Sequence, residues 1–218
     1  MEALEAGGCP FCTFYNGLED NALRFLMGPS VAYMEDDVRM ETNRLGFCKP
    51  HYERLYHSQN RLGLALMLHT HIETVLKKGY APTTKLKKKV EKESCYMCNM
   101  VEGSYARYVD TFFHLFAKED RPKELILQGE GFCMPHLGDA LEQAAKKLSG
   151  QKAKDFVKIV TTKQNEQLEK VYNDLDWFIK KFDYRFADEP WKDSKDAIER
   201  AIARLTKRLW GDKDKPKP

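Results

Sequence analysis

The sequence predicts an all-α protein. Apolar residues recur at helical spacing in several long stretches, and the strand-like alternation of apolar and polar residues is hardly found anywhere. A pattern of cysteines and a histidine also occurs twice, each time beside such helical stretches. The chain has 218 residues, 42% of them hydrophobic, so it can bury a core as one large domain or two small ones. We therefore expect a helical bundle built from two duplicated units plus C-terminal helices.

Each copy of the repeat is expected to contain two helices. In the first copy, helical spacing covers residues 14–27, which end before Gly28-Pro29, and residues 51–78, which are closed by Gly79. The equivalent segments in the second copy are residues 101–117 and 136–148. Beyond the repeats, residues 151–182 have apolar positions at helical spacing, and residues 194–209 predict a final helix.

The duplication rests on two short motifs. Cys9-Pro-Phe-Cys12 recurs as Cys95-Tyr-Met-Cys98, and Gly46-Phe-Cys48-Lys-Pro-His51 recurs as Gly131-Phe-Cys133-Met-Pro-His136. Equivalent positions lie 85 or 86 residues apart, so the two copies differ by one residue in their internal spacing. The predicted organisation is a first unit at 1–84, a second at 85–150, C-terminal helices at 151–211 that pack on both units, and a disordered tail at 212–218.

The repeated residues are typical of metal ligands. Two thiolates separated by two residues can bind one ion from a single turn, and the start of the next helix can supply a third thiolate and an imidazole. The sequence therefore predicts two structural Cys3His sites that each hold one zinc ion. The expected ligand sets are Cys9, Cys12, Cys48 and His51 for the first site, and Cys95, Cys98, Cys133 and His136 for the second.

Other interpretations of the cysteines are open. Cysteine with occasional histidine also binds iron–sulfur clusters, which the sequence alone does not separate from zinc. Buried free thiols would not fall in register twice, and a redox Cys-Pro-Phe-Cys pair lacks the expected βαβ surroundings. Haem attachment of the c type is excluded because Thr13 and Asn99 stand where that motif needs histidine.

A second, less specific group of residues is a candidate ligand or partner site. Asn60, Arg61, His69 and His71 lie in a stretch, residues 60–71, that is apolar on nearly all sides and is expected to form a central helix. His69 and His71 are two residues apart, so on a helix they point in different directions and cannot bind one ion. The aromatic segment 182–191 adds Asp183, Arg185 and Trp191, which form either a partner surface or a structured connection.

Charge and hydropathy restrict the partners. The formal net charge is +3, which gives no strong reason to expect nucleic acid or an acidic membrane as the main partner. A nucleic-acid hypothesis rests on the segment 85–92 and on a basic patch comprising Arg200, Arg204, Lys207 and Arg208. The longest apolar stretch, residues 62–68, is too short to span a bilayer, and residues 1–8 do not resemble a secretory signal. We expect a cytoplasmic protein.

The motifs also carry a family resemblance. At the two Gly-Phe-Cys-x-Pro-His motifs, the stretch 60–71 and the segment 183–191, the chain resembles a bacterial family known as a domain of unknown function. The likeness covers nearly the whole chain and implies a cytoplasmic bacterial protein, with no activity to carry over.

Three functions follow from these observations. The first is a zinc-stabilised helical scaffold or adaptor that binds an unknown protein or small molecule, and the closed ligand sets favour it. The second is an iron–sulfur or metal-dependent redox enzyme, and the third is a nucleic-acid-binding protein. Whether the protein is an enzyme, and its oligomeric state, are left open by the sequence.

Overall fold

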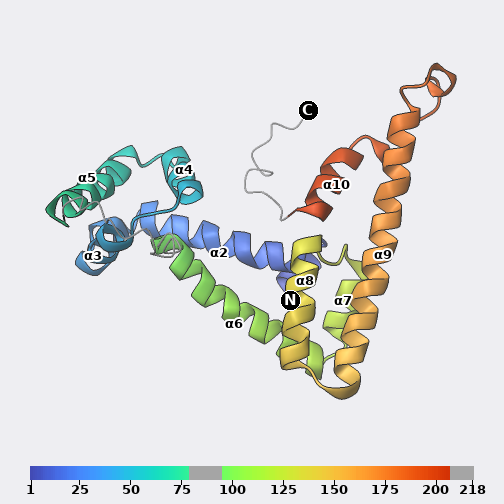
Figure 1. Ribbon diagram of the computed structural model, residues 1–218, viewed down its shortest axis with the longest axis horizontal. Coiled ribbons are helices and arrows are strands. Elements are labelled where there is room, and N and C mark those ends of the chain that lie inside the picture. Colours follow the sequence, from blue (N-terminus) through green and yellow to red (C-terminus); the bar gives the residue numbers. More distant parts are fainter. Residues whose placement is uncertain (79–94, 207–218) are drawn as a thin grey trace, which may run out of the picture. The chain divides into compact units, whose positions relative to one another are not determined.

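The structure is a computed structural model that describes residues 1–78 and 95–206, and these residues form helices and no strand (Figure 1). This confirms the predicted all-α class. The α-helices are α1 (Glu2–Glu5), α2 (Pro10–Met27), α3 (Asp36–Leu45), α4 (Lys49–His57), α5 (Arg61–Lys78), α6 (Tyr96–Lys118), α7 (Arg121–Gln128), α8 (Met134–Lys147), α9 (Gly150–Lys180) and α10 (Ala197–Leu205). Short 3-10 turns lie at Ala32–Met34, Tyr184–Phe186 and Lys192–Ser194. Within the described residues, no helix is long and apolar enough to cross a membrane.

The predicted helices at 14–27, 101–117, 136–148 and 151–182 correspond to α2, α6, α8 and α9, and the final helix is α10. The prediction of one helix over 51–78 is wrong, because the chain breaks between α4 and α5. Ser58 is extended and donates its hydroxyl to the Leu55 carbonyl at 2.6 Å. Asn60 then accepts a hydrogen bond from the Gly63 amide at 2.9 Å, as an N-cap does, so α5 starts anew.

The connections inside the repeats also contain helices. Helix α3 fills the connection of the first copy, with Asp36 and Asp37 in its first turn, where negative charge favours the helix N-terminus. Helix α7 fills the second connection and carries Pro122 in its first turn. Both connections are too polar for a strong apolar period, which is why the sequence did not identify these helices.

Helix α5 is not the central helix that its sequence suggests. It packs on α3 and α4, and it leaves Leu62, Ile72 and Leu76 exposed at 68%, 53% and 74% of their surface. A helix with apolar residues on every side does not specify which side other elements will cover. The compact unit around α5 is small and does not cover every side of this helix. The prediction that the stretch 60–71 is surrounded by other helices is therefore wrong.

The chain forms two compact units whose boundaries differ from the expected ones. The first unit comprises Met1–Asn16 and Arg107–Pro218, and the second comprises Gly17–Ala106. The expected units at 1–84 and 85–150 do not match this division, because each compact unit combines parts of both copies of the repeat. The expected packing of 151–211 on both units stays a prediction, and the tail at 212–218 lies outside the described residues.

An aromatic core fills the first unit. Six buried phenylalanines from four segments meet edge to face, with ring centroids 5.1 Å apart for Phe11 and Phe132, and 5.0 Å for Phe116 and Phe156. Such pairs contribute about 0.5–1.5 kcal/mol each beyond the burial of their area. Phe11 stands between the first two cysteines, and Phe132 directly precedes Cys133. The core therefore fixes the backbone that carries these cysteines.

Candidate metal centres

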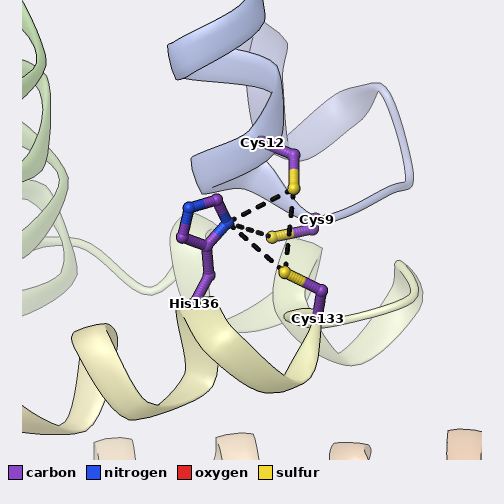
Figure 2. Close-up of side chains that lie close together, drawn as sticks. All are labelled: Cys9, Cys12, Cys133 and His136. Carbon is purple, nitrogen blue, oxygen red and sulfur yellow. Dashed lines mark hydrogen bonds between the residues drawn. The ribbon is translucent and has the colours of Figure 1, made fainter. Parts of the chain in front are cut away.

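The first centre is formed by Cys9, Cys12, Cys133 and His136. Figure 2 shows the two cysteines at the start of α2 facing the residues at the start of α8, with the three sulfur atoms around the Nδ1 atom of His136. The Nδ1 atom lies 3.5 Å from the Cys9 Sγ, 3.2 Å from the Cys12 Sγ and 3.4 Å from the Cys133 Sγ. Cys12, Cys133 and His136 are buried, and Cys9 is half-buried.

The second centre is formed by Cys48, His51, Cys95 and Cys98 in the same arrangement. His51 Nδ1 lies 3.1 Å from the Cys48 Sγ, 3.2 Å from the Cys95 Sγ and 3.5 Å from the Cys98 Sγ. The residues come from the start of α4 and from the start of α6. In each centre the four possible ligand atoms lie within 4.8 Å of one another, so each can hold one metal ion.

The grouping of the eight residues corrects the expectation from the sequence. Each centre takes its Cys-x-x-Cys pair from one copy of the repeat and its Cys-x-Pro-His from the other. The sets Cys9, Cys12, Cys48, His51 and Cys95, Cys98, Cys133, His136 do not form. The physical reason lies in the contacts of His51: its Nδ1 atom faces the sulfur atoms of Cys48, Cys95 and Cys98, and its Nε2 atom faces Glu19, so both ring nitrogens are engaged without Cys9 or Cys12.

The Gly-Phe-Cys-x-Pro-His motif has the same backbone geometry in both copies. Gly46 and Gly131 have positive φ values of 62° and 72°, which L side chains rarely adopt. Cys48 and Cys133 follow as extended N-cap residues with nearly equal angles, φ −72°, ψ 161° and φ −70°, ψ 159°. A proline in the first turn then pre-sets the helix. The motif thus places a thiol and an imidazole together at a helix N-terminus, where partial positive charge favours thiolate.

Without a bound cation, the thiols within each centre have different pKa values. In the first centre, hydrogen bonds from Cys12 and Cys9 lower the pKa of Cys133 far below its usual range, whereas hydrogen bonds to Cys12 and Cys133 raise the pKa of Cys9. In the second centre, burial raises the pKa of Cys95, but the hydrogen bond to His51, the backbone hydrogen bonds from Cys48 and Cys98 and the charge on His51 together outweigh burial and lower the pKa to about 6. Burial and the charge on Cys95 raise the pKa of Cys98. A bound cation would allow all three adjacent thiols to ionise together.

The two histidines respond to the same thiolates. Burial alone lowers the pKa of His51, but its hydrogen bonds to Cys95 and Glu19 raise it to about 10. For His136, burial likewise lowers the pKa, whereas hydrogen bonds to Cys12 and Cys133 raise it to about 9. In the absence of metal, each cluster thus attracts positive charge to the imidazole that lies at its centre.

An acidic and basic network supports the second centre. The Nε2 atom of His51 lies 2.9 Å from a carboxylate oxygen of Glu19, and Arg54 donates to the other oxygen of that carboxylate. Arg54 also donates to Asp20 at 2.7 Å. Glu19, His51 and Arg54 are all buried. The sequence pattern did not point to these residues; the one local signal is a pair of adjacent acids, Glu19 and Asp20, in the middle of a predicted helix.

A buried arginine supports the loop of the first centre. Arg204, on α10, donates to the carbonyls of Glu130 at 2.5 Å and Phe132 at 3.3 Å, just before Cys133. It also donates to the side chain of Gln167 at 3.1 Å. Burial lowers the pKa of Arg204, while Glu130 and the cysteines Cys9 and Cys133 act in the opposite direction. Arg204 therefore joins α9 and α10 to the turn that carries Cys133.

A family of unknown function, DUF6062, matches residues 1–212 of the chain. The chain belongs to this family. The match spans all eight residues of the two centres and confirms the family resemblance expected from the motifs. No curated protein and no solved structure matches the chain. Membership in DUF6062 assigns no activity, so the function has to be inferred from the two centres.

In this DUF6062 member, the residues of the 60–71 stretch do not converge on one site. Asn60 caps α5, and Arg61 lies 3.8 Å from the centre of the Tyr56 ring. His69 is exposed. His71 binds the Asn43 carbonyl through Nδ1 at 2.9 Å, and its ring lies where a side chain on Gly46 would stand. His71 thus supports the turn before Cys48.

The aromatic segment 182–191 forms a structured connection. Asp183 accepts from the Arg185 amide at 2.9 Å and forms an ion pair with its guanidinium at 2.6 Å. The Trp191 ring packs against Phe178, and Lys181 donates to three carbonyls of the segment, those of Phe186, Ala187 and Glu189. These bonds hold the connection between α9 and α10 in one shape.

The basic residues proposed for nucleic acid divide into two groups. Arg200 is held by Asp174 at 2.7 Å and Asp196 at 2.9 Å, and Arg204 is buried, so neither offers a free cation to phosphate. The segment 85–92, Lys207 and Arg208 lie outside the described residues.

Proposed function

We propose that the protein is a zinc-binding helical scaffold in which two structural Cys3His ions hold helix N-termini together. The observation that carries this proposal is the mutual distance of the ligand atoms. A tetrahedral zinc ion with bonds of about 2.3 Å to sulfur and about 2.0–2.1 Å to nitrogen places its ligands roughly 3.5–3.8 Å apart. The Cys12 and Cys133 sulfurs are 3.7 Å apart, the Cys48 and Cys98 sulfurs 3.9 Å, and the sulfur-to-nitrogen distances are 3.1–3.5 Å.

The same compactness favours a single ion over an iron–sulfur cluster. In a cluster the cysteines bind different iron atoms, with sulfide between them, so the ligand sulfurs spread over a larger space. Here all four ligand atoms of each centre lie within 4.8 Å. Four protein ligands also fill a tetrahedral ion and leave no position for substrate, which supports a structural role over a catalytic one.

The scaffold is proposed to act as an adaptor in a reducing compartment such as the bacterial cytoplasm. None of the six cysteines forms a disulfide, as metal-binding thiolates require. A partner, either a protein or a small molecule, would bind the surface that the ions hold in shape. Exposed Ile72, Val75 and Leu76 lie three and four residues apart, on one face of α5, and such a group of apolar side chains supports a protein partner.

Elemental analysis with an absorption spectrum tests the proposal. Purified full-length protein is expected to contain two equivalents of zinc and to be colourless. Replacement of zinc by cobalt should produce the visible bands of tetrahedral cobalt with thiolate ligands. Cys133→Ser and Cys48→Ser should each remove one equivalent, and His69→Ala, at an exposed position, should remove none. Iron with sulfide, or protein without metal, would overturn the zinc scaffold.

A further inference from the structure

In the second centre, a carboxylate lies on the side of the imidazole that faces away from the sulfur atoms. His51 turns Nδ1 toward three sulfur atoms and Nε2 toward Glu19, at 2.9 Å. A carboxylate in this position accepts a hydrogen bond from the Nε2–H group, so the proton stays on Nε2 and the lone pair on Nδ1 is available for a metal. The ring is thereby held in one orientation and in one tautomer.

Glu19 is itself held in place. Arg54, three residues after His51 on α4, donates to the oxygen of Glu19 that His51 does not use. The second nitrogen of Arg54 reaches Asp20 at 2.7 Å. The Arg54 side chain is 4% exposed and the Glu19 side chain 12%, so water competes little with these bonds. Helices α2 and α4 are thus joined through the group that faces the histidine.

We propose that Glu19 is a positioning residue that raises the metal affinity of the second centre, and that Arg54 and Asp20 fix the position of the Glu19 carboxylate. This proposal rests on the proposed zinc function. The hydrogen bond to the carboxylate increases the basicity of His51 and so makes it a better ligand. It also places a negative charge near the metal ion, on the other side of the imidazole ring. Loss of such a partner typically weakens metal binding about 10–100-fold. The first centre, which Glu19 does not touch, serves as the internal control.

The test resolves the two centres in one molecule. Full-length zinc-loaded protein is titrated with a competing chelator and then alkylated, and mass spectrometry measures the protection of Cys98 for the second centre and Cys12 for the first. In the Glu19→Gln variant, Cys98 is expected to lose protection at a chelator concentration about 10–100-fold lower than in the native protein. The chelator concentration at which Cys12 loses protection should change little. Asp20→Asn should also lower the chelator concentration at which Cys98 loses protection, but by a smaller factor, because the bond between Glu19 and Arg54 remains. The control is Glu41→Gln, because Glu41 is an exposed acid on α3 in the same unit; this substitution should change the protection of neither Cys98 nor Cys12.

A second readout separates positioning from simple destabilisation. In nitrogen-detected histidine NMR of the zinc-loaded protein, His51 should have a protonated Nε2 with a strongly hydrogen-bonded proton, and Glu19→Gln should weaken that signature. Unchanged protection of Cys98 in Glu19→Gln, with two zinc ions still bound, would overturn the role of Glu19 and leave the scaffold standing. Equal losses at Cys98 and Cys12 would show a global effect and would also overturn it. Absence of metal from the native protein would instead refute the scaffold.

Discussion

The sulfur atoms of Cys12 and Cys133 lie 3.7 Å apart although the residues are 121 positions apart in the chain. Cys12 belongs to the first copy of the repeat and Cys133 to the second. The other centre joins Cys48 to Cys98 in the reverse combination, at 3.9 Å. A metal ion in either centre therefore crosslinks the two copies, so neither copy can complete a centre by itself.

This crossed pairing predicts which thiols a single substitution exposes. Cys133→Ser should release metal from the first centre and make Cys9 and Cys12 reactive to alkylation, while Cys48, Cys95 and Cys98 stay protected. Mass spectrometry of peptides after brief alkylation measures this, with the zinc-loaded native protein as the control. Pairing within each copy would give the opposite pattern, with Cys95 and Cys98 reactive and Cys9 and Cys12 protected.

Removal of the metal should unfold much of the protein. Structural zinc sites of this kind supply roughly 10–16 kcal/mol of binding free energy in small domains, which is comparable to the roughly 5–15 kcal/mol stability of a whole domain. We expect a strong chelator to cause a large loss of helical signal in far-ultraviolet circular dichroism, and we expect zinc to restore it. Retention of the full helical signal after both ions have been removed would show that the core alone holds the fold.

The chemistry of the centres could be predicted from the sequence, but their pairing could not. The eight residues share types and spacing in both copies, so a ligand set drawn from one copy looks identical to a set drawn from both. The deciding contacts are tertiary: His51 turns Nδ1 toward Cys95 and Nε2 toward Glu19, so its ring is engaged by residues from two other helical segments. Nothing in the local pattern of either motif encodes these contacts.

The helices show the same limit. Long apolar periods identified α2, α6, α8 and α9, whereas the break at Asn60 depends on one side chain that caps α5. The exposed face of α5 could not be predicted, because an apolar residue such as Leu76 is buried only if another element covers it. No local pattern predicts the role of Arg204, since its backbone partners, the carbonyls of Glu130 and Phe132, lie more than 70 residues away and its side-chain partner Gln167 lies on another helix.

The glycines before the cysteine and histidine motifs should be difficult to replace, and Gly46 most of all. Its φ of 62° and ψ of −156° fall in a region that is essentially limited to glycine, where another residue costs about 1–3 kcal/mol. A Cβ there would also lie 2.9 Å from the His71 ring. Gly46→Ala is expected to lower the midpoint of chemical unfolding. Gly17→Ala, at a helical position with open space, should raise it slightly, and a similar loss in both variants would contradict the backbone argument.

Metal affinity should rise with pH. In the metal-free protein the pKa values of His51 and His136 are raised to about 10 and about 9, so both imidazoles carry an additional proton at neutral pH. An ion must displace that proton from Nδ1, and it must also displace the proton of Cys98, whose pKa is raised. Zinc binding therefore releases protons and is weaker at about pH 6 than at about pH 8. Calorimetry in buffers of different ionisation enthalpy measures the release, and an affinity independent of pH would contradict it.

Arg204 should matter for the first centre in the way that the Glu19 network matters for the second. Replacement by methionine keeps much of the volume but leaves the carbonyls of Glu130 and Phe132 without their buried donor, which costs about 1–3 kcal/mol. Because these carbonyls belong to the turn that presents Cys133, part of this cost should appear as weaker zinc binding. In the Arg204→Met variant, we expect Cys12 and Cys133 to lose protection from alkylation at a lower chelator concentration than in the native protein. The concentration needed for Cys98 should change little.

The matched control for this prediction is Arg200→Met. Arg200 lies one turn earlier on α10 and also joins that helix to α9, through Asp174 at 2.7 Å. Its bonds do not reach the turn before Cys133, so its loss should lower the stability of the α9 and α10 contact without weakening zinc at the first centre. If Arg200→Met and Arg204→Met reduce the protection of Cys133 equally, Arg204 acts through the packing of α10 alone. If only Arg204→Met does so, the hydrogen bonds to the Cys133 turn carry the effect.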